Sequence, residues 1–178
     1  MSRRQRIRMT DAEVTSLLAQ ERTVICATLG PRGWPHLMPL WYVLRAAPAE
    51  PGGGSDMPPA AERSPTLWAW TYAASQKVRN LERDPRATLL VESGESYEQL
   101  RGVALECDVA IHRDPGTVAA LGREIFRRYA APRGRPPVAE LHADVAAMVQ
   151  RQAAKRVGLE FIERRRATWD HAKLGGAY

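Results

Sequence analysis

The chain has 178 residues, of which 44% are hydrophobic, and this length supports one domain with its own core. Neither Cys26 nor Cys107 belongs to a CxxC pair, which excludes a disulfide scaffold and a cysteine zinc site and indicates a reducing, cytoplasmic compartment. No apolar run approaches the roughly 20 residues of a membrane span, and no apolar segment follows the basic N-terminus as in a secretory signal.

The net charge of +6 is concentrated at the N-terminus. Four of the six charges come from arginines in the first eight residues, namely Arg3, Arg4, Arg6 and Arg8. No predicted helix carries a stripe of base-reading side chains, so we expect no specific nucleic-acid partner, although a basic accessory module acting through this arm is an alternative. Residues 1–9 are predicted to be a disordered basic arm, and residues 10–178 a single domain.

The domain begins with a helix and two strands. Thr10 and Glu13 form a capping box, which predicts a helix over 11–21. A β-rich apolar run predicts a buried strand over 23–29, and turn chemistry follows it.

The second strand is predicted over 34–45. It contains Pro35 and Pro39, which indicates an edge or bulged strand. Residues 46–65 are rich in Pro, Gly and Ala and predict a flexible insert. The three glycines at 52–54 neither follow a strand nor open a helix, so they are not a phosphate loop.

The rest of the chain alternates short strands and helices. In chain order we predict a strand at 66–71, a helix at 75–83, strands at 87–92 and 100–112, helices at 115–129 and 138–154, a strand at 157–162, and an extended piece at 168–171. These short, mostly meandering strands predict an α+β, mainly β fold, an antiparallel barrel with peripheral helices.

A candidate anion site lies where the 66–71 strand meets the following helix. Hydroxyl groups of Thr71 and Ser75, the free N–H groups of the helix N-terminus and the ammonium of Lys77 together suit a phosphate group. Lys77 is one of only three lysines among 26 basic residues, and Arg79 or Arg86 could add a second cation. The alternative is that Ser75 merely caps the helix and Lys77 points into water.

Two further segments are candidates for contact with a small molecule. In the segment 34–42 the two prolines free backbone groups to bind the edge of a planar ring, against which Met38 or Trp41 could pack. The alternative is an apolar strand in the core or in a dimer interface. The C-terminal segment 167–178 is rich in aromatic and charged residues for a chain terminus, which predicts a docked segment that contacts the substrate or a partner subunit through Trp169, His171 and Lys173.

The sequences PHLMPLWY, SQKVRNLERDPRATLLVE and LRGVALECDVAIHRDP resemble the pyridoxamine 5′-phosphate oxidase-like split β-barrel flavoproteins, and within them the F420- or FMN-dependent oxidoreductases. The resemblance implies a homodimer with the cofactor at the subunit interface. It implies cofactor-binding roles for ten residues: Met38, Pro39, Leu40, Trp41, Trp70, Thr71, Ser75, Gln76, Lys77 and Arg86. The strand HLMPLW and the tail lack the basic substrate clamp of vitamin-B6 oxidases, so that activity is not expected.

Three functions are therefore considered. The first is hydride transfer between bound F420 or FMN and a small conjugated substrate, for which Tyr72, His171 and Tyr178 are candidate proton donors. The second is a non-catalytic flavin or haem carrier, with His36, His112 or His171 as a haem ligand. The third is the nucleic-acid module above. No metal site is expected, because the four histidines are scattered.

Overall fold

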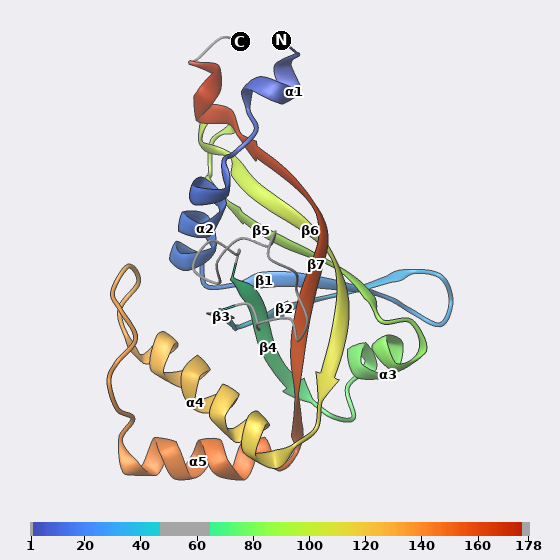
Figure 1. The fold of residues 1–178 in the computed structure, drawn as a ribbon, viewed down its shortest axis with the longest axis vertical. Coiled ribbons are helices and arrows are strands. Elements are labelled where there is room, and N and C mark those ends of the chain that lie inside the picture. Colours follow the sequence, from blue (N-terminus) through green and yellow to red (C-terminus); the bar gives the residue numbers. More distant parts are fainter. Residues whose placement is uncertain (1, 47–64, 176–178) are drawn as a thin grey trace, which may run out of the picture.

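The computed structural model describes residues 2–46 and 65–175, and its centre is one seven-stranded antiparallel sheet that curls into a half-barrel (Figure 1). The strand order is β2-β1-β5-β6-β7-β4-β3. The strands are β1 (Val24–Leu29), β2 (Pro35–Leu40), β3 (Tyr42–Arg45), β4 (Thr66–Tyr72), β5 (Arg86–Ser93), β6 (Arg101–His112) and β7 (Arg156–Asp170).

Helices surround this sheet. They are α1 (Arg3–Arg6), α2 (Asp11–Gln20), α3 (Gln76–Arg83), α4 (Pro115–Ala130) and α5 (Ala143–Ala153), with short 3-10 turns η2 (Tyr97–Gln99) and η3 (His171–Leu174). In Figure 1, α4 and α5 lie together at one end, and α3 lies beside the β1–β2 hairpin. None of the helices within 2–46 and 65–175 is long and apolar enough to span a membrane.

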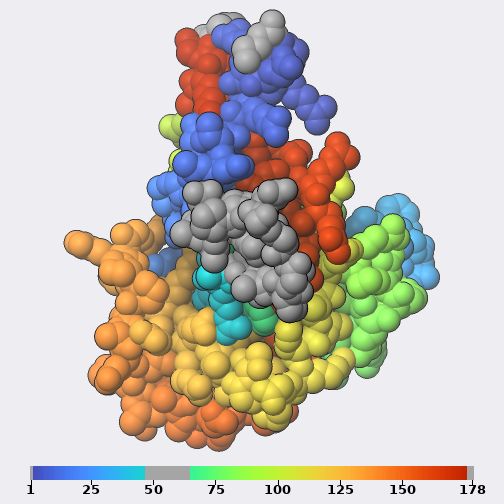
Figure 2. Space-filling view, viewed as in Figure 1, coloured from blue at the N-terminus to red at the C-terminus, as the bar shows by residue number. Residues whose placement is uncertain are grey.

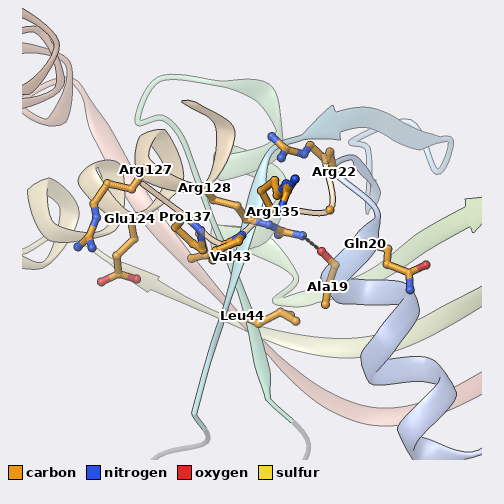
Figure 3. A pocket seen from close by; sticks show the side chains of 12 residues that line it. Ala19, Gln20, Arg22, Val43, Leu44, Glu124, Arg127, Arg128, Arg135 and Pro137 are labelled. Carbon is orange, nitrogen blue, oxygen red and sulfur yellow. Dashed lines mark hydrogen bonds between the residues drawn. The ribbon is translucent and has the colours of Figure 1, made fainter. Parts of the chain in front are cut away.

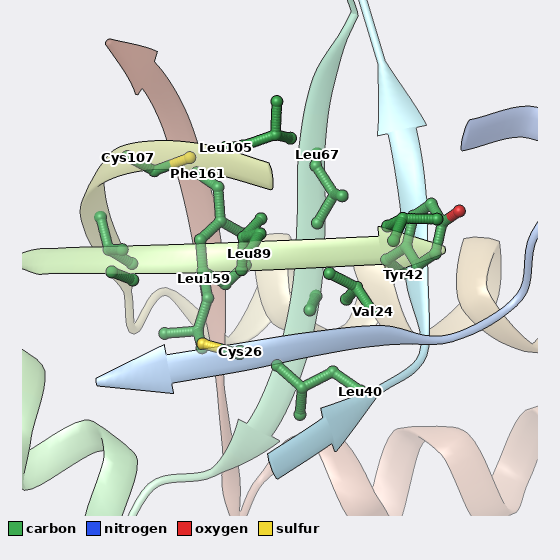
Figure 4. Close-up of a cluster of buried hydrophobic side chains, with 14 of the residues drawn as sticks. Val24, Cys26, Leu40, Tyr42, Leu67, Leu89, Leu105, Cys107, Leu159 and Phe161 are labelled. Atoms are coloured by element: carbon green, nitrogen blue, oxygen red, sulfur yellow. The ribbon is translucent and has the colours of Figure 1, made fainter. Parts of the chain in front are cut away.

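Strand β4 separates two hydrophobic cores, because successive side chains of a strand point to opposite faces. Leu67 and Ala69 belong to the barrel core, which contains Tyr42, Leu89 and Phe161 and is shown in Figure 4. Trp68 and Trp70 belong to a second core with α4 and α5. Trp70 passes so close to Gly122 of α4 that a Cβ there would lie 2.5 Å from the ring. Thr71, the next residue after Trp70, therefore points to the barrel side.

Most predicted elements are confirmed. The Thr10–Glu13 capping box is present, and Asp114 caps α4 through the N–H of Thr117 at 2.8 Å. The expected single strand over 34–45 is instead two strands that are interrupted at Trp41. Strand β2 pairs with β1 and β3 pairs with β4, so the two prolines do lie on an edge strand, as expected.

Two boundaries in the C-terminal half are corrected. The expected strand at 157–162 and the extended piece at 168–171 form one 15-residue strand, β7. The polar residues 163–166 had no apolar periodicity, yet they pair with β6 across a bulge between Glu106 and Cys107. The helix expected from 138 begins only at Ala143, because Val138 is held by α4, its N–H donating to the carbonyl of Arg127 at 3.0 Å.

The basic arm is not disordered over its described part. Residues 3–6 form α1 with a capping box at Ser2, and the following segment joins β7. The N–H of Asp170 donates to the carbonyl of Ile7 at 2.7 Å, and the N–H of Met9 donates to Thr168 Oγ1 at 3.0 Å. The N- and C-terminal segments thus pack side by side, as Figure 2 shows in blue and red. Residues 47–64 of the expected insert lie outside the described residues.

One arginine of α4, Arg128, binds both strand β3 and the C-terminal end of α2. The guanidinium of Arg128 donates to four carbonyl oxygens, those of Tyr42 at 2.6 Å, Leu18 at 3.0 Å, Ala19 at 3.1 Å and Glu21 at 2.7 Å. Three of these belong to the last turn of α2 and its C-cap, whose carbonyls have no partner within the helix. The cation also lies 4.4 Å from the ring centroid of Tyr42.

We expect Arg128→Met to lower the free energy of unfolding by about 2–4 kcal/mol, because it removes a cation that donates to four carbonyls and leaves that of Ala19 without another side-chain donor among the described residues. Arg123→Met, on the exposed side of the same helix, is the matched control and should change stability by less than about 0.5 kcal/mol. Urea denaturation measures both, and equal effects of the two substitutions would contradict the assigned role of Arg128.

Candidate functional site

A buried lysine stands at the junction of β4 and α3. Strand β4 ends at Tyr72, the chain turns, and α3 begins after Ser75, so that Lys77 lies in the first helical turn. Its side chain is only 6% exposed, and its Nζ donates to Thr71 Oγ1 at 2.9 Å. No ion pair of Lys77 occurs among the residues that the structure describes. An ammonium has three donors, so most of this group's hydrogen-bonding capacity is unused.

The surroundings disfavour the charge on Lys77. Burial lowers the pKa of Lys77, and the nearby Arg156 cation lowers it further, while Cys26 acts in the opposite direction. The Cys26 thiol does not supply a counter-charge, because burial raises its pKa to about 12. A desolvated ammonium with a second cation nearby and no acid is the arrangement expected where an anion binds.

Ser75 adds a second sign of a ligand. It occupies the N-cap position of α3, but its hydroxyl makes no capping hydrogen bond, and its Oγ is buried without any partner. Buried polar side-chain atoms in native proteins nearly always have a partner. The hydroxyl stands two residues before Lys77 at the free N–H groups of the helix, where an anionic oxygen can accept a hydrogen bond from it.

Strand β2 presents a further unpartnered polar atom, a histidine ring nitrogen, on the same side of the sheet. His36 pairs with Thr28 in the β1–β2 ladder, so the two side chains share a face. Thr28 Oγ1 accepts from the amide of Asn80 on α3 at 3.0 Å, which places this face against α3. The Nδ1 atom of His36 is buried without a partner. Together, Thr71, Ser75, Lys77 and His36 form what we call the α3 socket.

The other three predicted residues near α3, namely Gln76, Arg86 and Trp70, lie outside the socket. Gln76 is exposed, and its amide donates to Asn80 Oδ1 at 2.8 Å. Arg86 is exposed and binds Asp84 through two hydrogen bonds of 2.9 and 2.7 Å, an ion pair that lowers the pKa of Asp84 to about 2. Trp70 lies on the other face of β4, in the second core.

The predicted ring-binding segment follows the edge of the sheet toward α4. Met38 and Pro39 are exposed, and Leu40 is buried in the barrel core. Trp41 stacks on Tyr129 with ring centroids 4.3 Å apart, yet it remains 48% exposed. The segment thus offers an open apolar strip that starts beside His36 and ends at Trp41.

The C-terminal segment lies at the end of the molecule opposite α4 and α5, far from α3 (Figure 1). The Trp169 ring covers Gly102, and His171 Nδ1 lies 3.0 Å from the carbonyl oxygen of Tyr97. Lys173 Nζ donates to Glu13 Oε2 at 2.6 Å, and this ion pair lowers the pKa of Glu13 to about 2. These side chains contact Gly102, Tyr97 and Glu13, and none of them contacts the α3 socket.

Sequence reasoning missed two groups at the site. His36 was considered only as a haem ligand, although its place opposite Thr28 puts it in the socket. Arg156 was not considered. It pairs with Tyr72 and lies on the Trp70 side of β4, outside the socket, with its guanidinium 4.5 Å from the Trp70 ring centroid and 4.1 Å from that of Tyr72, and its charge still lowers the pKa of Lys77. Its buried Nε has no hydrogen-bond partner. Only the β4–β7 register brings it there. No cluster of three or more potential metal ligands occurs among residues 2–46 and 65–175.

The electrostatics of the α3 socket predict an unusual stability effect. Lys77→Met should leave the free energy of unfolding of the ligand-free protein unchanged or raise it by about 1 kcal/mol, because it removes a desolvated charge and keeps the buried chain length. Lys155→Met, at an exposed lysine, is the control. Thermal unfolding without added ligand measures both, and a loss of more than about 2 kcal/mol at Lys77 would show a purely structural lysine.

The chain is similar to known proteins in its sequence and in its fold. The sequence matches the family described as pyridoxamine 5′-phosphate oxidase over residues 10–152. No protein with a curated description matches the chain.

Three solved structures are informative. A conserved hypothetical protein from Mycobacterium tuberculosis is 32% identical, with 100% of this chain and 95% of that chain covered and a TM-score of 0.76. An F420 reductase is 20% identical (85% and 93% covered, TM-score 0.53), and an FAD-binding protein from Mesorhizobium loti is 14% identical (90% and 94%, TM-score 0.55). The chain therefore belongs to the pyridoxamine 5′-phosphate oxidase family and has its split β-barrel fold.

Proposed function

We propose that the protein is an oxidoreductase that binds coenzyme F420 or FMN and transfers a hydride between it and a small conjugated substrate, such as a quinone or an enone. The observation that carries the proposal is the buried ammonium of Lys77, which has one neutral acceptor and no acid, next to an unpartnered Ser75 hydroxyl. Both cofactors carry a phosphate group joined to a flat ring system, and the α3 socket fits the phosphate.

Different residues hold the phosphate and the ring of such a cofactor. Lys77 and Ser75 bind the phosphate, with Thr71 orienting the ammonium and the N-terminus of α3 adding positive potential. The strip from Met38 to Trp41 lies along the ring, since its exposed apolar surface begins beside the socket. The bound ring supplies the hydride chemistry, and the protein supplies position and electrostatics.

The proposal includes a homodimer with the cofactor at the interface. Edge strand β2 and the turn before it expose Trp34 at 76% and Leu37 at 57%, a large apolar surface for a monomer. Exposed apolar patches of this kind mark interfaces, and a partner subunit there would cover the same strip that contacts the ring.

A haem carrier is the second candidate, and His36 favours it. Of the three histidines considered as ligands, His112 contacts Glu160 at 2.8 Å and His171 contacts a backbone carbonyl, whereas His36 has an unpartnered Nδ1. Absorption of the purified protein together with fluorescence of the cofactor released on denaturation separates the candidates, because haem gives a Soret band without fluorescence, whereas F420 and FMN are fluorescent.

Titration of cofactor-free protein with F420 and with FMN, followed by fluorescence, tests the proposal. Lys77→Ala should weaken binding of the preferred cofactor by more than about tenfold, and Ser75→Ala by a smaller factor, because charge-assisted hydrogen bonds to the phosphate are lost. Lys155→Ala should bind like the wild type. Unchanged affinity in Lys77→Ala, or no binding of either cofactor to the wild type, would overturn the proposal.

The affinity should also depend on pH through Lys77. Its pKa lies below the usual 10.5, and an anion binds the charged form. Affinity is therefore full while the ammonium is protonated and falls as pH rises through the lowered pKa. Lys77→Ala should lose this alkaline fall, whereas a fall of the same size in the variant would assign it to another group.

A further inference from the structure

A cavity lies elsewhere in the molecule, away from the α3 socket. It has a volume of about 570 Å³ and lies between the end of α2, strand β3, helix α4 and the loop at 134–137 (Figure 3). Small-molecule sites usually measure roughly 300–1,000 Å³. None of the residues of the α3 socket lines it.

Its lining is strongly cationic. Four arginines line the cavity, namely Arg22, Arg127, Arg128 and Arg135, and Glu124 supplies the single carboxylate of the lining. That carboxylate is already neutralised, because Arg45 binds both of its oxygens at 2.8 and 2.9 Å. The cavity therefore carries an excess of positive charge.

The four guanidinium groups differ in how many N–H donors they have free for a ligand. Arg128 gives its N–H groups to backbone carbonyls, and Arg22 donates to the carbonyls of Ala131 at 2.8 Å and Tyr129 at 3.5 Å, so both contribute mainly charge. Arg127 uses only its Nε, on the carbonyl of Val138 at 2.8 Å. Arg135 is exposed, and its side chain has no hydrogen bond or ion pair to any described residue.

The cavity is preformed rather than a gap beside a loose loop. The N–H of Val138 donates to the carbonyl of Arg127 and Arg127 Nε donates back, which fixes the loop to α4. Arg133 forms an ion pair with Glu21, which fixes the same loop to the end of α2. A preformed site loses little entropy on binding.

The rest of the lining is apolar, with Val43 and Leu44 from β3 and Pro136 and Pro137 from the loop. A planar guanidinium binds carboxylate or phosphate through two parallel hydrogen bonds and also packs on flat rings. We propose that this cavity binds a small organic acid, in which an apolar body lies against β3 and the two prolines and a carboxylate or phosphate group binds Arg135, while the other arginines add positive potential.

Calorimetric titration with three matched compounds tests this inference. We expect 2-naphthoate and 2-naphthyl phosphate to bind at least about tenfold more tightly than 2-naphthol, because only the first two carry the acid group. Inorganic phosphate should bind more weakly than the naphthyl anions, because it lacks the apolar body. Whichever naphthyl anion binds more tightly identifies the acid group.

Three variants locate the binding. Arg135→Gln should weaken the naphthyl anions at least about fivefold without changing the melting temperature, because this exposed side chain contacts only the ligand. Arg151→Gln, an exposed arginine of α5, and Lys77→Ala should both bind like the wild type. Equal binding of 2-naphthol, an unchanged affinity in Arg135→Gln, or loss of binding in Lys77→Ala would overturn the inference.

Discussion

The charge on Lys77 is the constraint around which one end of this molecule is organised. Removing an ammonium from water is costly unless a counter-charge or several hydrogen bonds replace the water. Here the replacement is a single threonine hydroxyl, and Arg156 adds a second positive charge nearby. The turn after β4 holds Lys77 in this position by joining a strand of the barrel core to a short helix. The fold therefore carries an electrostatic cost, which the anion binding proposed above would offset.

The strand order explains how one short segment, β2 followed by β3, supplies both edge strands of the sheet. Strands β2 and β3 are consecutive in the sequence, with only Trp41 between them, yet they stand at opposite ends of the strand order. This connection curls the sheet into a half-barrel. It also carries the exposed apolar strip from the α3 socket to the aromatic stack of Trp41 on Tyr129.

Local patterns were enough to predict most of the elements. The capping box at Thr10, the alternation along β6 and the Asp114 cap are short-range signals, and each matches the structure. The failures share a cause, since they involve segments whose pairing partner is distant in the sequence. The polar run at 163–166 forms a strand only because β6 lies beside it, and the break at Trp41 exists because its two sides have different partners.

In the candidate site, too, residues close in the sequence could be predicted and residues from distant strands could not. Thr71, Ser75 and Lys77 lie within seven residues of one another, so a strand followed by a helix was enough to bring them together. His36 and Arg156 come from strands that are about 40 and 80 residues away, and only the ladder register places them near α3. Arg86 was assigned by sequence proximity to the socket, but its own neighbour Asp84 binds it.

The position of β7 in the strand order has a consequence for how the chain matures on the ribosome. Among the described strands, β4 and its neighbour β3 are hydrogen-bonded to the other strands only through β7, which lies between β6 and β4. Thr71 pairs with Val157 in that ladder, so the wall that buries Lys77 is incomplete until about residue 161 has left the exit tunnel. Segments that emerge early can therefore form only part of the sheet, and Thr71 gains its neighbour on β7 late in synthesis.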